Sequence, residues 1–588
     1  DLTAAADTIT VAASAIVSTR KTNAGGNSSG DAGDIDFSAQ TIDVGTSAQL
    51  LAQVESGSAY HAGDITLDAD VFSIVRFSDD DAPSATITIT GATIQGDALV
   101  IEASAYEPFG IFGFTKQATA EITITDAALV GNVVTIDALA DTTVIPPTDV
   151  SMSGNPTLTF NATAGTITRD EGDWIDDGFF TGQAITVSGT NDNDGEFIVE
   201  SVDGATLNLS DATLVDETAS NVTLIGSFLV PDPESLGDAI ADYLLGFSIP
   251  SALVSLSEAT AEVKLLGASS IVSAGGVLIN ATANSRATPF FPGIPIPALA
   301  GLTAAYADSE ATAEASVQGT TTIQSSTGDV EVTAATDTTV VSNAVLTARN
   351  KPVSLGFAGA ITTVSTKAFI DAGASVTADD VTVSAESVID VEAGTAVYNQ
   401  GSSGVGLVLA LNLLDSTTQA YIAGTVDAHG SVEVAATADI LNFITQSDSV
   451  ILGSTRDLST QLANAQATFL QTPLKSLAGD SFPSSSIIET LFPVIKSGKF
   501  NLSGAVTFAQ ADNQVDAYIA DGAVVKAEED VDISATIIFR PYSTASAQST
   551  SDGAAIGGAV IFDNFDNHAK AYIGAANVNA KGALNLSA

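Results

Sequence analysis

One short pattern, apolar–polar–apolar–polar–Ala, returns along this chain and constrains its fold more than any other feature. Its fullest form is the segment GDITLDA at residues 63–69, in which a turn-forming Gly-Asp pair precedes the alternating residues. Ten copies begin their alternating part at Ile35, Ile65, Leu99, Val134, Val277, Val330, Val381, Val432, Val531 and Leu584. In the second half of the chain, successive copies are 53, 51, 51, 99 and 53 residues apart. A regular period of this length predicts a solenoid or array. The 99-residue step predicts either a double step or one repeat that carries an insertion.

Each copy has the pattern of one β-strand, because alternation with period two places the apolar residues on one face and Thr, Asp or Glu on the other. At a rise of about 3.3 Å per residue, 50 residues make two or three rungs of roughly 20 residues. We therefore predict an all-β fold, an elongated right-handed parallel β-solenoid (β-helix) with a small inserted antiparallel β-domain and short helical insertions. The apolar run from Val405 to Leu411 predicts a fully buried strand.

The repeat divides the chain into four parts. Residues 1–145 are predicted to form an N-terminal solenoid section with copies every 30 to 35 residues, and residues 261–588 a C-terminal solenoid with repeats of about 52 residues. The later repeats also carry a second phrase, Ala-(Tyr/Phe)-Ile, as at 420–422. Residues 229–260 predict a partly helical connector with a capped start. A helical excursion is expected near 452–499, as two short helices.

Residues 146–228 break the repeat and predict a separate small domain. They contain four or five short alternating segments with Gly, Asn and Asp turns and the chain's one tryptophan, Trp174. This spacing predicts a small antiparallel barrel or sandwich. The hairpin loop NDNDG at 191–195 resembles half of a calcium loop but lacks the Glu expected further on. Asp192 and Asp194 are therefore candidate Ca²⁺ ligands, with a plain Asp-Gly hairpin turn as the alternative.

Charge excludes one class of partner. The chain has 18 Lys and Arg against 70 Asp and Glu, for a net charge of −52. Nucleic acid is excluded as a partner because phosphate binding needs a cationic footprint. Such acidity attracts divalent cations, so Ca²⁺ binding stays open, while no cofactor is expected to be required. No uninterrupted apolar run reaches about 18 residues, so no membrane insertion is expected.

Catalytic chemistry has little support in the sequence. The chain has no cysteine, which excludes disulfides, thiolate metal sites and cysteine nucleophiles. Its three histidines, His61, His429 and His568, each lie beside a predicted turn in a different repeat, and no spacing suits zinc. Paired carboxylates such as Asp563 with Asp566 lack a basic residue placed to act with them. We therefore assign no catalytic and no cofactor-binding residue.

Two apolar loops are candidate contact surfaces. One lies in the first solenoid section and the other is stiffened by prolines, which cannot sit in a central strand. Exposed apolar loops on a solenoid cover its own side or contact other subunits. The assembly candidates are Phe109, Phe112, Phe114, Phe290 and Phe291.

The repeats resemble those of giant repetitive bacterial surface and secreted proteins, of the filamentous-haemagglutinin-like or RTX-type adhesin class. The likeness rests on the segments 18–21, 30–35, 48–52 and 60–65 together with the repeated pattern, and it covers most of 1–145 and 261–588. It implies a secreted, stacked β-solenoid with an adhesive or structural role, and it carries over no catalytic residue. The Gly-Gly-x-Gly-x-Asp nonapeptide of RTX calcium rolls is missing.

Three functions follow as expectations. The first is a non-enzymatic extracellular rod, acting as a surface adhesin or as the subunit of a filament or sheath through end-to-end stacking. Its partners would be further copies or a continuation of the same chain, with glycans or cell surfaces as targets, and its location the bacterial cell surface. We expect the chain to be a processed or excised part of a longer protein. The alternatives are a carbohydrate-active β-helix enzyme, a polysaccharide lyase or glycosidase, and a glycan- or surface-binding module centred on 146–228.

Overall fold

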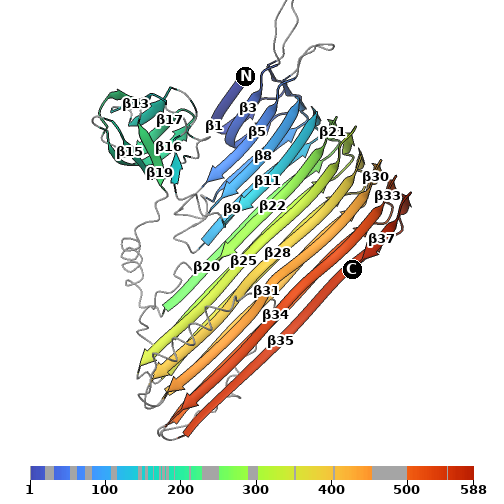
Figure 1. Ribbon diagram of the computed structural model, residues 1–588. Coiled ribbons are helices and arrows are strands. Elements are labelled where there is room, and N and C mark those ends of the chain that lie inside the picture. The colour runs from blue at the N-terminus through green and yellow to red at the C-terminus, as the bar shows by residue number, and fades with distance from the viewer. Residues whose placement is uncertain are drawn as a thin grey trace, which may run out of the picture.

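Parallel strands stack along one axis in the computed structural model, and they lengthen from the N-terminal to the C-terminal end (Figure 1). Among the residues that the structure describes there is no helix. The described residues are 2–588 outside the segments 20–31, 53–61, 73–81, 108–114, 144–148, 153–155, 163–164, 171, 173, 175–178, 180–183, 191–192, 211–213, 221, 228–250, 289–301, 350–352, 401–403, 453–499 and 552–553. The fold is a parallel β-solenoid, as the repeat predicts.

Every coil of the solenoid has three sides. Side 1 carries the repeated pattern, in strands β5 (Ile65–Phe72), β8 (Ala98–Tyr106), β11 (Val133–Asp141), β22 (Val277–Ala287), β25 (Val330–Arg349), β28 (Val381–Gln400), β31 (Val432–Leu452), β34 (Val531–Thr550) and β37 (Leu584–Ser587). Side 2 comprises β6 (Ser84–Thr90), β9 (Thr115–Thr125), β20 (Ser251–Leu266), β23 (Leu302–Val317), β26 (Val353–Ile370), β29 (Gly404–Ile422), β32 (Phe500–Ile519) and β35 (Ala554–Ile573). The first two coils run through sides 1 and 2 in one continuous strand each, β1 (Leu2–Val11) and β3 (Ile35–Val44).

Side 3 is a ladder of strands only three or four residues long. They are β2 (Ile16–Ser18), β4 (Gln49–Leu51), β7 (Thr93–Gln95), β10 (Ala128–Gly131), β21 (Ser270–Ser273), β24 (Thr322–Ser325), β27 (Ser375–Ala378), β30 (Thr425–Ala428), β33 (Val524–Ala527) and β36 (Asn577–Ala580). The corner before side 3 needs glycine in later coils. Gly319 has φ +69°, and a Cβ there would lie 2.5 Å from the carbonyl oxygen of Gly267 in the preceding coil.

All ten copies of the pattern lie in register. Val330 aligns with Val381, and Val381 with Val432. Val432 in turn pairs directly with Val531, so the 99-residue step is one repeat that carries an insertion, not a double step.

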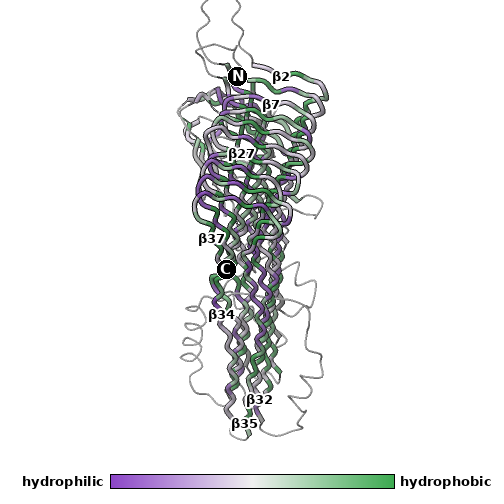
Figure 2. The backbone as a smooth tube through the Cα atoms, turned by 90° about the vertical axis from the view of Figure 1, so that its right-hand side faces the viewer, coloured by the Kyte–Doolittle hydropathy of each residue, from purple (hydrophilic) through white to green (hydrophobic). Residues whose placement is uncertain are grey.

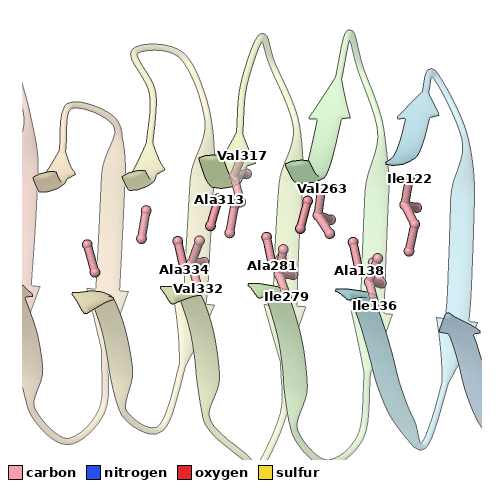
Figure 3. Close-up of a cluster of buried hydrophobic side chains, with 14 of the residues drawn as sticks. Ile122, Ile136, Ala138, Val263, Ile279, Ala281, Ala313, Val317, Val332 and Ala334 are labelled. Carbon is pink, nitrogen blue, oxygen red and sulfur yellow. The ribbon is translucent and has the colours of Figure 1, made fainter. Parts of the chain in front are cut away.

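A single hydrophobic core runs through the coils inside the three sides, and we call this part the column. Its buried side chains repeat by position, as Figure 3 shows for Ile136, Ile279 and Val332 on side 1 facing Ile122 and Val263 on side 2. Ile136, Ile279 and Val332 are all fully buried. The same residue types recur at each level, so each coil buries its inward side chains mainly against the equivalent side chains of the neighbouring coils.

In later coils sides 1 and 2 extend beyond the column as two facing sheets, which we call the fin. It consists of 335–349 with 353–366 and of the residues paired with them in the next three coils, 386–400 with 404–418, 437–452 with 500–515, and 536–550 with 554–569. Figure 2 shows the rounded coils of the column at one end of the view and the thin two-layered fin at the other.

Residues 149–227 form an eight-stranded antiparallel sheet of their own. Its strands are β12 (Asp149–Ser151), β13 (Leu158–Asn161), β14 (Thr166–Arg169), β15 (Ala184–Ser188), β16 (Gly195–Asp203), β17 (Thr206–Ser210), β18 (Glu217–Ala219) and β19 (Thr223–Ser227), in the order β12-β19-β15-β16-β17-β14-β13-β18. Trp174 is fully buried in its core, donates Nε1–H to the carbonyl of Ala205 at 2.8 Å, and carries the Arg169 guanidinium 4.7 Å from its ring centroid.

Three sequence expectations need correction. Each repeat makes a single three-sided coil, not two or three rungs of roughly 20 residues, because its strands pair with those of the next repeat, as Val330 with Val381 and Val381 with Val432. Residues 251–260, expected to belong to a partly helical connector, are the start of strand β20; the preceding residues 228–250 lie outside the described part of the chain, as do 453–499 of the expected helical excursion. The run from Val405 to Leu411 is a strand, but it is not buried on both faces. Its even-numbered residues point between the two sheets and are buried, while Val405, Leu407 and Leu409 point outward and are half-buried.

Candidate contact surfaces

The acidic residues of the Gly-Asp turns connect successive coils. The backbone N–H of Asp64 donates to Asp34 Oδ1 at 2.9 Å, and the N–H of Ala98 donates to Asp64 Oδ1 at 2.9 Å. The later coils repeat the contact, where the N–H of Asp380 donates to Asp329 Oδ1 at 3.1 Å. A carboxylate that accepts a backbone N–H satisfies a turn donor that no strand can pair. The Asp of the repeated phrase therefore has a structural use in the stack.

Other carboxylates form a row of like charges on the outer face of side 1. Asp68, Glu102 and Asp137 occupy the same position in three successive coils. Burial raises the pKa of all three, and for Glu102 the two neighbouring carboxylates raise it further. The row ends at Asn280, whose Nδ2 donates to Asp137 Oδ1 at 2.8 Å. Like charges directly opposite each other in a sheet are destabilising, so this row weakens the stack at neutral pH.

An aromatic ladder lies on the outer face of side 2. Phe369, Tyr421, Tyr518 and Tyr572 stack in order with ring centroids 4.8, 4.9 and 4.8 Å apart and interplanar angles of 7°, 8° and 4°. They are the middle residues of the Ala-(Tyr/Phe)-Ile phrases. Exposure rises from 8% at Phe369 to 43% at Tyr572, because the last ring has no ring stacked on its outer face in the described structure. The ladder thus ends with an open aromatic face.

Both end faces of the column leave core positions open. The first residue of the repeated pattern is 0% exposed at Ile35 and at Val531, but the equivalent Leu2 in the first coil is 42% exposed and Leu584 in the last coil is 48% exposed. Leu586, next inward-facing in the last coil, is 46% exposed. These end faces present the hydrophobic cross-section that every interior coil covers.

A buried charge lies where the column begins to widen into two layers. Lys116 of β9 is 6% exposed and its Nζ donates to the carbonyl of Thr142 at 2.9 Å. Burial, with Arg286 nearby, lowers the pKa of Lys116 to about 7. Ser257 takes the same inward position in the next coil and shares a hydrogen bond of 2.7 Å with Thr142 Oγ1. Lys116 thus lies between the sheets of sides 1 and 2, at an inward position where later coils carry hydroxyl groups.

The structure gives Asp194 a local role. Its Oδ1 accepts hydrogen bonds from the backbone N–H and the hydroxyl of Thr190, at 2.7 and 2.8 Å, and the backbone hydrogen bond is the main cause that lowers the pKa of this carboxyl. The neighbouring Asn193 points inward and bonds to Val215 in both directions. Asp192 lies outside the described residues, as do the predicted contact residues Phe109, Phe112, Phe114, Phe290 and Phe291.

The described part of the chain lacks two further kinds of feature. No group of three or more His, Cys, Asp or Glu side chains there could hold a metal ion. No helix within it is long and apolar enough to cross a membrane.

Comparisons with known proteins give no family. No protein-family model matches the chain, and no curated protein matches it. Among solved structures, the chain is similar to a tailspike of an Acinetobacter baumannii bacteriophage in complex with A. baumannii capsular saccharide, with 9% sequence identity, coverage of 85% of this chain and 72% of that chain, and a TM-score of 0.11. At that TM-score the similarity supports no argument about this protein.

Proposed function

We propose that this protein is a non-enzymatic, extracellular structural protein, a rigid β-solenoid rod that extends by stacking coil on coil. One observation carries the proposal: the copies of the repeated pattern stack in register around one continuous hydrophobic core, in which Ile35 and Val531 are both fully buried between neighbouring coils. In a solenoid each coil is stabilised mainly by its neighbours, so a further coil with the same pattern can extend the stack.

The rod is proposed to act outside a bacterial cell, as a surface adhesin or as the subunit of a filament or sheath. Its end partner is another coil of the same kind, from a second copy or from more of the same chain. The open ring of Tyr572 supports a partner coil with an aromatic residue at this position, since stacked aromatic pairs add about 0.5–1.5 kcal/mol beyond the area they bury. The antiparallel domain at 149–227 is the proposed element for contact with glycans or surfaces.

Electron microscopy of the purified protein tests end-to-end stacking. We expect rods whose length grows with protein concentration, and we expect Leu586→Asp to shorten them, because it places a charge in the open core. Asn579→Asp is the matched control. It adds the same charge to the same coil, at an outward position beside Lys526. Monodisperse short rods at every concentration would contradict the proposal, as would equal shortening by both variants.

A further inference from the structure

One outer face of the fin is apolar over four neighbouring strands. In β29 every outward position from 405 to 413 is Val or Leu. The flanking strands continue the surface in register, with Phe357 on one side and Val506 and Phe508 on the other. We call this surface, the outward side of 353–361, 405–413, 502–510 and 556–564, the apolar face; its outward residues are apolar except Gln510 and Asn564 at the margin nearest the column.

The apolar face is flat and open at its margins. A Cβ at Gly359 would lie 2.9 Å from the Phe357 ring, so that ring lies over the glycine and does not stand up from the sheet. Leu411 at the centre is 5% exposed and Leu409 is half-buried, whereas Leu355 and Phe562 at the margins are 36% and 43% exposed. A surface of this kind is well suited to another flat sheet.

The opposite face of the same fin mixes polar and apolar side chains, because Tyr398, Ile444 and Val450 also point outward there and are 5%, 6% and 7% exposed. There Asn343 Nδ2 donates to Glu392 Oε1 at 2.7 Å, and Asn442 Nδ2 donates to Asp390 Oδ1 at 3.0 Å. Both pairs join neighbouring coils through outward side chains. The described part of the fin thus interrupts its apolar side chains with charged and amide groups on this face, whereas β29 carries an unbroken run of outward Val and Leu on the other.

We propose that the apolar face binds the apolar face of a second copy of this chain, so that two fins pack sheet against sheet. Four strands spaced about 4.8 Å apart and ten residues rising about 3.3 Å each give roughly 600 Å² per copy. Two copies would then bury about 1,200 Å², the lower end of the range for stable protein interfaces. Face-to-face sheet packing with interdigitating aliphatic side chains is an ordinary way for such surfaces to be covered.

Charge sets the orientation of the pair. The apolar face is bordered on its column side by a row of carboxylates, Asp415, Asp512 and Asp566, aligned in three successive coils. If two fins pointed the same way, these rows would face each other and repel. If they point in opposite directions, each row lies at the outer margin of the partner's apolar face. The pair is therefore antiparallel, with its two-fold axis near Leu409 and Val506.

Sedimentation velocity over a concentration series tests the proposal. We expect the protein to dimerise and Leu409→Asn to weaken dimerisation at least tenfold. Val388→Asn is the matched control, because Val388 is also an outward, half-buried aliphatic residue of a fin strand but lies on the opposite face. The chain has no cysteine, so Val506→Cys introduces the only thiol; oxidation should join two copies through it, while Val388→Cys should stay monomeric.

The outcome is separable from that of end-to-end stacking. Leu586→Asp should leave the fin dimer unchanged, since the two surfaces do not overlap. A protein that stays monomeric at all concentrations overturns the inference, and so does equal weakening by Leu409→Asn and Val388→Asn. Dimerisation that occurs only after residues 453–499 are deleted also overturns it, because the chain itself would then be the occupant of the apolar face.

Discussion

The column and the fin are made of the same strands, yet their interiors differ in chemistry. In the column, inward positions are Ile, Leu, Val and Ala, and large side chains such as Ile136 are fully buried. In the fin, inward positions are largely Ser, Thr, Asn, Gly and Ala. Thr366 Oγ1, for example, lies 2.8 Å from Thr336 Oγ1 and 2.7 Å from Ser387 Oγ, and Ser387 Oγ lies 2.8 Å from Thr418 Oγ1.

This difference indicates where stability comes from. Burial of aliphatic surface contributes about 1.5–3 kcal/mol for each large side chain, whereas a hydrogen bond between neutral groups contributes about 0.5–1.5 kcal/mol net. The column should therefore contribute most of the free energy that holds the coils together, and the fin should contribute less. Small side chains let the two sheets of the fin approach each other closely, so the fin is thin.

The largest expected effect is in the column. Ile136→Ala removes a fully buried side chain and should cost about 2–5 kcal/mol through lost burial and a residual cavity. The loss should be local to the neighbouring coils, because coils contact only their neighbours. Native-state hydrogen exchange measures this as faster exchange in β8, β11 and β22. An effect spread evenly over the chain would contradict the local model.

A smaller effect is expected in the fin, and it should depend on hydrogen bonding. Thr366→Val leaves the Thr336 and Ser387 hydroxyls without a shared partner and should cost about 1–3 kcal/mol. Thr338→Val makes the same change at a buried hydroxyl that has no hydrogen-bond partner in the structure, so it should be neutral or slightly stabilising. Hydrogen exchange of the fin strands compares the two variants. Equal losses of stability in the two variants would contradict a contribution of the Thr366 hydrogen bonds.

The smallest effect concerns the outer charges of the column. Burial and Asp68 raise the pKa of Asp70 from 3.8 to about 6, and the pKa values of Asp68, Glu102 and Asp137 are also raised. Carboxyls with raised pKa bind protons more tightly in the folded state, so stability should rise as pH falls from above 6 towards 4.

Glu102→Gln should stabilise these coils at pH 7 and reduce the pH dependence, by less than about 1 kcal/mol because the groups are partly exposed. Hydrogen exchange of β5, β8 and β11 at pH 7 and pH 5, corrected for intrinsic rates, gives the result. If acidification within this window weakened the protection of these strands, the assignment of the row as a repulsive one would be wrong.

The column could be predicted from the sequence because its interior obeys the expected alternation. At Ile65-Thr66-Leu67 and each later copy, the apolar residues point inward and the register follows from aligning them. The aromatic ladder has a signal in the sequence, because the middle residue of an Ala-Tyr-Ile triplet must point away from the face shared by Ala and Ile. Recurrence of that triplet at one register position predicts stacked rings.

The fin could not be predicted because its polarity is inverted on side 2. The change begins one coil before the fin, in β20, where Ser255 and Ser257 point inward and Leu256 points outward, so the apolar alternation of the column is lost there. In β29 the outward Val and Leu residues alternate with inward Gly, Val and Ala, so the run reads as buried on both faces. A two-layered sheet whose interior mixes hydroxyls with scattered apolar residues such as Val364, Ile389 and Phe443 gives no regular hydrophobic periodicity.

The direct pairing of Val432 with Val531 has a consequence for how such a chain can change. Coils separated by 99 residues align as closely as coils separated by 51, and Asp137 and Asn280, which lie 143 residues apart, still share a hydrogen bond. The extra residues leave and rejoin where side 1 passes into side 2. Each coil therefore has one place, the connection from side 1 to side 2, at which residues can be inserted or deleted without disturbing the neighbouring coils. New functions can be added there while the stacked strands stay the same.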